Sequence, residues 1–395
     1  MRDHLLPFGW SNVTRLALVM LLSNLYFYLP VGTLYLQSKG LNYVEINSLW
    51  AIIVGTMFLA EVPTGLLADR IGRARSVQMA LALQVVGEVI FLLAPNYLTF
   101  VAAAVAGGIG FAFSSGSAQA LVYDSLLRRG EEQEMSRAMG YISAAKGAGN
   151  LAAFGLASLL FVSLSTARFQ QAIAMTAIMV FGGWLVSLTL RDAEAQLPDE
   201  DAPGTLAILR TAVATLRTNR RFLHLILLAL VTIPFVDYLL NLYQPRFVEV
   251  GVAPSWLGLS LAAASLVGIA AARSAYQVER RLGAARSLLL VTALPGALYL
   301  LFAAAQEPVA AVPLFCLLFG VMSMKEPLFS GHLNRHIASS HRATVLSLIN
   351  MASGVYVAIM GLVIGRIADL SLVYAFLFMG GIVLSGALVF RLRNG

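Results

Sequence analysis

The amino-acid sequence predicts an all-α integral membrane protein with twelve transmembrane helices in two related six-helix halves. Of the 395 residues, 59% are hydrophobic and only 12% are charged, which is outside the usual balance of a soluble domain. Apolar stretches of about 20 residues, the length that crosses roughly 30 Å of hydrocarbon as a helix, recur along the whole chain. One long polar interval divides these stretches six and six.

The first six spans are apolar stretches separated by short polar or glycine-containing turns. They cover residues 14–36, 44–69, 74–94, 98–127, 138–164 and 167–190. The remaining six cover residues 222–248, 255–279, 287–305, 309–334, 343–367 and 370–391. All are too long and too evenly apolar for the strands of a membrane barrel. We expect helices, because a helix satisfies its own backbone groups inside the bilayer.

The polar interval, residues 191–221, separates an N-terminal domain of residues 1–190 from a C-terminal domain of residues 222–395. It begins acidic and becomes basic, and Leu206, Leu209, Val213 and Leu216 recur in it at helical spacing. The pattern is typical of an amphipathic helix lying on the inner membrane surface. A solvated linker helix would show the same pattern.

The two halves of the sequence resemble each other. Gly40 and Gly72 have counterparts 211 residues later at Gly251 and Gly283, and a second register of 205 residues relates Gly149 to Gly354. The matches occur in order and at equivalent turns. They favour a duplicated six-helix unit, as in transporters built from parallel repeats.

The arginine residues indicate the orientation of the chain, because segments rich in Lys and Arg stay on the cytoplasmic side. With both termini inside, nearly all arginines fall on inner segments, and the outer ends hold only Lys39, Arg168, Arg246 and Arg366. This asymmetry accounts for the net charge of +7, so a nucleic-acid partner is not needed to explain it.

Two further features concern processing and covalent structure. The first fourteen residues lack a cleavage site and lead into a span that is too long for a signal-peptide core, so we expect the first helix to stay uncleaved. The only cysteine, Cys316, lies in the tenth span, which excludes an intrachain disulfide framework.

A charged stretch, Gly65-Leu-Leu-Ala-Asp-Arg-Ile-Gly-Arg-Ala-Arg75, lies between the second and third spans. In that position its residues resemble the signature of the major facilitator superfamily: Gly65, Asp69, Arg70, Gly72, Arg73 and Arg75. The preceding Glu61-Val-Pro-Thr-Gly65 resembles a bacterial permease branch of that family. The resemblance implies a secondary transporter of the bacterial inner membrane, with a cavity between two six-helix domains that opens alternately to either side.

The same resemblance implies that the charged stretch is a gate. Asp69 ends a helix, where the dipole disfavours a carboxylate, so it needs cationic or N–H partners. Arg70, Arg73 and the N-terminus of the eleventh helix are the expected ones. Other residues would assist: Asp124 as a second acid, Gly65 for close helix approach and Gly72 for the tight turn. The alternative is a charge cluster that only sets the orientation.

Two departures separate this sequence from many proton-driven drug exporters. Those proteins carry an arginine on the fourth helix before a glycine pair, where Ala104 stands here before Gly108 and Gly110. Many antiporters also have a proline in a glycine-rich stretch of the fifth helix. The corresponding Lys146-Gly-Ala-Gly-Asn150 has none.

Ionisable residues inside the predicted spans are costly and usually functional. The candidates for a proton and substrate site are Glu61, Lys146, Asp237, Lys325 and Glu326. A carboxylic acid in a cavity can bind a proton on one side and release it on the other if no fixed cation keeps it ionised. Glu61 and Asp237 fit this requirement best, since Glu326 stands beside Lys325. Glu88, with Gln84 one turn earlier, is expected to make structural hydrogen bonds.

Neutral polar residues share helix faces with these groups and complete the candidate cavity. They are Asn24 and Tyr28 on the first helix, Asn150 on the fifth, Asn241 and Gln244 on the seventh, and Asn350 on the eleventh. Hydrogen bonding between helices would explain them equally well.

The sequence therefore predicts a secondary active transporter of a small amphipathic organic molecule, with proton-coupled efflux as the main hypothesis. The alternatives are a proton-coupled importer or facilitator and, more remotely, a membrane receptor. No sequence motif of a membrane-embedded enzyme, a metal site or a cofactor site is present. The expected partners are the cargo, protons and the bilayer, and the chain is expected to be a monomer.

Overall fold

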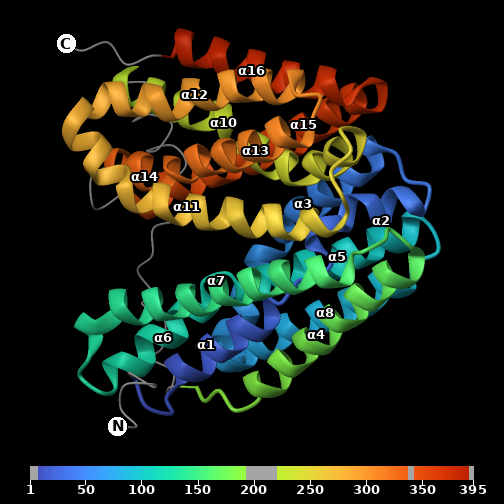
Figure 1. Ribbon diagram of the computed structural model, residues 1–395. Coiled ribbons are helices and arrows are strands. Elements are labelled where there is room, and N and C mark those ends of the chain that lie inside the picture. The colour runs from blue at the N-terminus through green and yellow to red at the C-terminus, as the bar shows by residue number, and fades with distance from the viewer. Residues whose placement is uncertain (1–7, 193–219, 337–341, 391–395) are drawn as a thin grey trace, which may run out of the picture. The chain divides into compact units, whose positions relative to one another are not determined.

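A computed structural model describes residues 8–192, 220–336 and 342–390 (Figure 1). Every regular element in these ranges is a helix. Ten described helices are long and apolar enough to cross a membrane, and a shorter apolar helix covers Asn12–Ser23. The count of twelve spans stays a prediction, and the predicted linker helix around residues 206–216 lies outside the described residues.

By its contacts the chain forms two compact units. Unit 1 comprises Met1–Lys39 and Ile52–Asp199. Its helices are α1 (Asn12–Ser23), α2 (Gly32–Ser38), the greater part of α3 (Tyr43–Ile71), α4 (Arg73–Leu93), α5 (Tyr97–Ser114), α6 (Ser117–Leu127), α7 (Met135–Leu160) and α8 (Thr166–Ser187), with the 3-10 helices η1 (Leu29–Val31) and η2 (Glu132–Glu134).

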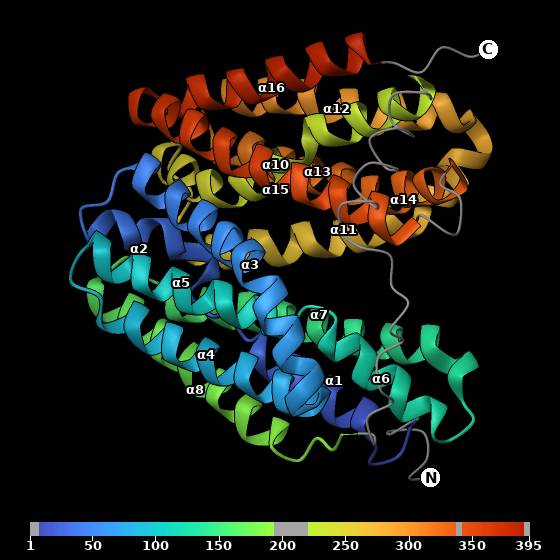
Figure 2. The same ribbon diagram turned by 180° about the vertical axis from the view of Figure 1, so that it is seen from behind.

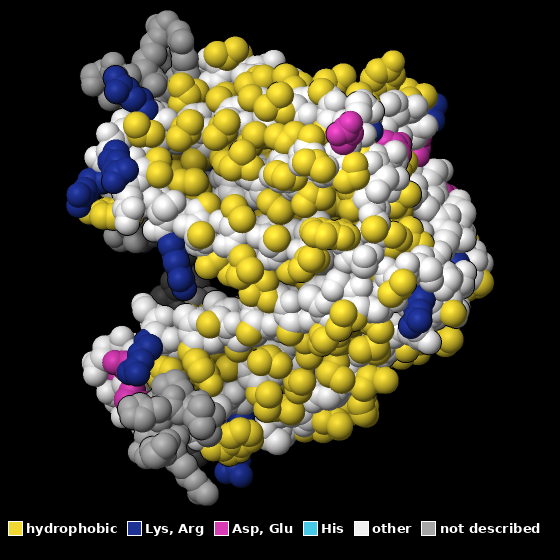
Figure 3. All heavy atoms as spheres, viewed as in Figure 1, with side chains coloured by type: hydrophobic (Ala, Val, Ile, Leu, Met, Phe, Trp, Pro, Cys, Tyr) yellow, Lys and Arg dark blue, Asp and Glu magenta, His cyan; other side chains and the backbone are white. Residues whose placement is uncertain are grey.

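Unit 2 comprises Gly40–Ala51 and Glu200–Gly395, so it includes the first residues of α3. Its other helices are α10 (Arg220–Glu249), α11 (Ser255–Leu282), α12 (Ala284–Ala304), α13 (Pro308–Ser323), α14 (Lys325–His336), α15 (Arg342–Leu370) and α16 (Leu372–Val389). Within this unit α12 packs against α16, α11 against α13, and α10 against α15 (Figures 1 and 2). Apolar side chains are spread over the visible helix surface, and the Lys, Arg, Asp and Glu side chains that can be seen are few (Figure 3), as expected of helices that face lipid.

Three predicted spans are each divided into two helices. Residues 14–36 form α1 and α2 with η1 between them, and Pro30 in η1 has no N–H to continue the helix from α1. Residues 98–127 divide between Ser114, where α5 ends, and Ser117, where α6 begins, and Gly116 between them has a φ of +74°. Residues 309–334 divide at Met324, where Pro327 removes the donor that would bond to the Ser323 carbonyl.

Glycines allow several helices of unit 1 to pack at backbone distance. A Cβ placed on Gly108 of α5 would lie 2.7 Å from the Ile53 carbonyl oxygen, and one on Gly149 of α7 would collide with the Leu21 carbonyl oxygen of α1. By contrast, Gly147 of α7 has open space around such a Cβ. Small residues at such crossings are the usual packing device of membrane helices.

Arg246, near the end of α10, is buried with only 4% of its surface exposed. Its Nη2 donates to the carbonyl oxygens of Ala303 and Ala305 at 3.0 and 2.6 Å, and its Nη1 donates to Glu249 at 3.0 Å. The guanidinium therefore stabilises the C-terminal end of α12, where the helix dipole is negative.

Candidate functional site

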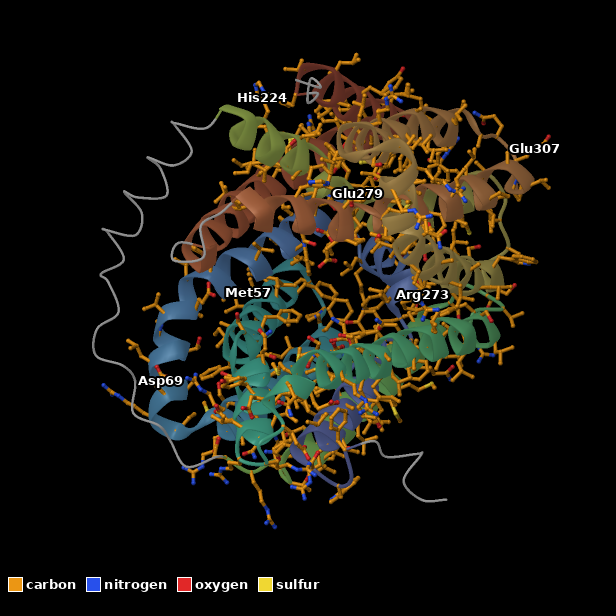
Figure 4. The ribbon with its side chains drawn as sticks, turned by 90° about the vertical axis from the view of Figure 1, so that its left-hand side faces the viewer. Met57, Asp69, His224, Arg273, Glu279 and Glu307 are labelled. Carbon is orange, nitrogen blue, oxygen red and sulfur yellow. The ribbon has the colours of Figure 1, made fainter. Side chains whose placement is uncertain are left out.

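The charged stretch after α3 is a tight, internally bonded turn. Asp69, near the end of α3 (Figure 4), accepts from Arg73 at 2.8 Å. Gly72 has a φ of +101°, which L-residues with a side chain rarely adopt. This agrees with the tight turn expected at Gly72.

Asp192, just beyond α8, completes this turn and was not among the residues predicted for the gate. Its carboxylate accepts from the backbone N–H of Ala74 at 2.6 Å, in the first turn of α4. A Cβ on Gly72 would collide with the same carboxylate. An acid at a helix N-terminus is favourable, so Asp192 anchors the end of α8 to the start of α4.

The remaining residues of the expected gate lie around this turn in unit 1. Arg70 and Arg75 are exposed, Asp124 on α6 is half-buried, and no atom lies within 4 Å of where a Gly65 Cβ would stand. The proposed partner of Asp69, the N-terminus of α15, belongs to unit 2. A latch between Asp69 and that helix therefore stays a prediction.

A buried polar cluster in unit 2 brings together two of the predicted cavity residues. On α10, Asn241 donates to the Asn47 side-chain oxygen at 3.4 Å, and Asn47 donates to the Gly361 carbonyl of α15 at 3.1 Å. Asp237, one turn before Asn241, is half-buried, and the indole of Trp50 faces its carboxyl group. The cluster therefore joins α10 and α15 to the first residues of α3.

Asn47 and Trp50 were missed by the sequence interpretation. Asn47 is fully buried, yet its partners lie about 190 or more positions away along the chain, and no local pattern reports such a contact.

The backbone around the cluster is held by tyrosine hydroxyls: Tyr238 donates to the Val357 carbonyl at 2.7 Å, and Tyr299 donates to the Phe235 carbonyl at 2.6 Å.

The side chains of Lys325 and Glu326 lie in different environments, one buried and one exposed, although the two residues are adjacent in sequence. The Lys325 ammonium is buried and donates to the Ala229 carbonyl and the Thr232 hydroxyl of α10. Glu326 is exposed. Lys325 therefore ties the start of α14 to α10 through neutral acceptors.

The other predicted cavity residues are dispersed. Glu61 and Lys146 are exposed on α3 and α7, and Asn150 is half-buried on α7. Gln244 is buried and donates to the Leu240 carbonyl at 3.0 Å. Asn350 lies in α15, and its side chain is outside the described residues.

Two predicted residues mark the break in the first span. Asn24 directly follows α1 as its C-cap and donates from its side chain to the Met20 carbonyl at 2.8 Å. The Tyr28 hydroxyl donates to Glu88 of α4 at 3.2 Å. Tyr28 thus contacts an acid that the sequence interpretation had treated as structural.

Solved structures of membrane transporters share this arrangement of helices. A crystal structure of the nucleoside transporter NupG matches with a TM-score of 0.76 and 15% identity, over 96% of this chain and 98% of that chain. A D-xylose-proton symporter matches with a TM-score of 0.72 and 14% identity, over 96% of both chains. At these identities the likeness shows a shared fold.

The chain belongs to the Major Facilitator Superfamily, whose profile matches residues 16–359. An uncharacterized MFS-type transporter of Bacillus subtilis (strain 168), YxaM, is 19% identical over 350 residues, which are 86% of this chain and 84% of that protein. A "Probable vesicular acetylcholine transporter-A" of Danio rerio is 29% identical over 162 residues, 41% of this chain and 31% of that protein.

Proposed function

We propose that this protein is a proton-coupled exporter that moves a small amphipathic organic molecule across a bacterial inner membrane by alternating access. The proposal rests on membership of a transporter family together with one observation, the half-buried Asp237 in the polar cluster of unit 2. An acid in such a place is expensive to maintain in a membrane helix and is usually functional.

Asp237 suits proton exchange better than Glu61 does. It faces the indole of Trp50 and stands one turn from Asn241, which itself bonds to the buried Asn47. Such polar neighbours accept or donate without fixing the charge of the carboxyl group. Glu61, by contrast, is exposed on α3. We therefore assign the coupling proton to Asp237 in preference to Glu61.

Asp237→Asn should strongly reduce accumulation driven by a pH gradient and retain exchange of labelled for unlabelled cargo. Exchange requires alternating access but no net proton movement, whereas accumulation requires both. The cargo is first found by a thermal-shift screen of small amphipathic compounds on the purified protein, and uptake is then measured in proteoliposomes. We expect accumulation to fall by about tenfold or more, equivalent to at least ~1.4 kcal/mol of lost coupling.

Glu307→Gln is the matched control, because Glu307 is an exposed acid that precedes α13 of the same unit (Figure 4). It should leave both measurements unchanged. If Asp237→Asn still accumulates cargo with the pH dependence of the unaltered protein, Asp237 does not carry the proton. Accumulation in the opposite direction relative to the gradient would favour an importer.

The proposed orientation places both chain termini in the cytoplasm and is tested by cysteine labelling. In a Cys316→Ala background, Lys39→Cys should react with a membrane-impermeant thiol reagent in intact cells, and Arg129→Cys should not. Arg129 is exposed and Lys39 is half-buried at the end of α2, so both are within reach of a reagent present on their side of the membrane. Labelling of Arg129→Cys from outside would reverse the orientation.

A further inference from the structure

The first predicted span leaves the helical conformation in its middle. α1 ends at Ser23, and η1 and α2 resume only at Leu29 and Gly32. Irregular backbone at such depth in a membrane is tolerated where protein buries it or where it lines a cavity. In transporters, discontinuous helices frequently mark the site of an ion or proton.

The irregular segment, residues 24–28, is fastened to neighbouring helices of unit 1 through side chains. The backbone N–H of Phe27 donates to Thr176 of α8 at 3.0 Å. Two residues one turn apart on α4 hold the tyrosines on either side: Gln84 donates to the Tyr26 hydroxyl at 2.5 Å, and Glu88 accepts from the Tyr28 hydroxyl at 3.2 Å.

Glu88 is the residue of this cluster whose hydrogen-bonding capacity is not used up. Its side chain is only 7% exposed. Oε1 accepts from Tyr28, but Oε2 is buried and has no hydrogen-bond partner among the described residues. A buried carboxylate without a cation is costly, whereas its protonated form carries no net charge.

The described helices around Glu88 supply no cation to pair with it. The titratable groups that face it are the hydroxyls of Tyr26 and Tyr28. α5 and α6 pack on α4; α5 has no charged residue, and the charged residue of α6 is an acid, Asp124. Tyr35 of α2 carries a neutral hydroxyl group.

The cations on the neighbouring elements are engaged elsewhere. Arg15 of α1 donates to the Thr189 carbonyl at 2.6 Å, and Arg168 of α8 donates to Gln171 at 3.4 Å. Lys39 stands over the Tyr35 ring at 5.6 Å. Arg73 and Arg75 begin α4, thirteen or more residues before Glu88, which is about 20 Å along a helix.

We propose that Glu88 is a second proton-binding site, in which Oε2 takes up a proton from water and returns it while Oε1 keeps the Tyr28 hydroxyl. A proton fits better than a larger ligand because aromatic rings fill the surroundings. The rings of Tyr26 and Tyr28 are 5.8 Å apart, and Tyr28 stacks on Phe91 at 5.2 Å. The proposal rests on the proposed proton coupling for its role in transport, since it gives unit 1 a counterpart to Asp237.

Infrared difference spectroscopy tests this site without any cargo. Spectra of the purified protein in lipid, recorded between alkaline and acidic pH, should show the C=O band of a carboxylic acid that forms on acidification. Glu88→Gln should lose this band. Tyr28→Phe should keep it at a higher frequency, because the phenol no longer donates to Oε1. Glu134→Gln, which removes a partly exposed acid of the same unit, should leave that band in place.

Identical difference spectra of Glu88→Gln and the unaltered protein would overturn the proposal, because Glu88 would then keep one protonation state and serve only as a hydrogen-bond acceptor. If Glu88→Gln does not fold, Tyr28→Phe decides: a shifted band supports the site, and an unchanged set of bands overturns it. A Glu88 band in a protein that shows no proton-driven accumulation would refute the proposed function but not this proton site.

Discussion

Transport by Asp69→Asn should fall by about tenfold or more while the amount of folded protein in the membrane changes little. The substitution keeps the shape of the side chain but removes the charge that accepts from Arg73 at 2.8 Å. If the turn biases one of two conformational states, a loss of ~1.4 kcal/mol in that state changes their ratio about tenfold. The measurement is exchange of labelled cargo in proteoliposomes, normalised to the monodisperse protein that is incorporated.

Glu134→Gln provides the comparison for this prediction. Glu134 and Arg137 form a surface ion pair at 3.1 Å. Each side chain of this pair and of the Asp69–Arg73 pair is at least one-third exposed. Exposed ion pairs contribute little to stability, so neutralising Glu134 should leave transport unchanged. Equal transport by both variants would reduce the charged turn to a determinant of orientation.

Gly149→Ala should strongly lower the midpoint of thermal unfolding in detergent. The added Cβ would collide with the Leu21 carbonyl oxygen of α1, and overpacking of this kind typically costs about 1–3 kcal/mol. Backbone atoms cannot move aside as the end of a flexible side chain can, so α1 and α7 would have to separate.

Gly147→Ala is the matched control because it lies two residues away on α7, where no atom stands within 4 Å of the added Cβ. There the same substitution only raises helix propensity, by roughly 1 kcal/mol. We expect the unfolding midpoint of Gly147→Ala to be equal to or above that of the unaltered protein. Similar midpoints for the two variants would show that α1 and α7 do not approach closely at Gly149.

Local chemistry in the sequence predicted the helical membrane fold and the turn at Gly72. Apolar stretches report membrane helices because the bilayer imposes their length, and a glycine between Ile71 and Arg73 reports a left-handed turn because its φ is free. The three helix breaks were not predicted, although Pro30, Gly116 and Pro327 caused or marked them. Hydropathy averaged over a span is not changed by one proline without a backbone N–H or by one glycine with a positive φ.

The candidate sites were predictable in part only, since contacts across the fold determine them. Asp237 and Tyr28 were identified from their positions in the spans. Trp50, which faces Asp237, and Glu88, which accepts from Tyr28, are far away from them in the sequence. Lys325 and Glu326 illustrate the opposite error, because adjacency suggested a pair that the helix geometry separates.

The bonding of Arg246 changes how the charge pattern of the chain should be counted. In the proposed orientation Arg246 is one of the few basic residues near the outer face, yet its guanidinium donates to two carbonyl oxygens at the C-terminal end of α12, those of Ala303 and Ala305, and to the Glu249 carboxylate. Together with Glu249 it adds no net charge to the outer water layer. In that orientation the difference in net charge between the inner and outer segments is therefore larger than a count of arginines suggests. A larger charge difference favours the proposed orientation more strongly over the inverted one.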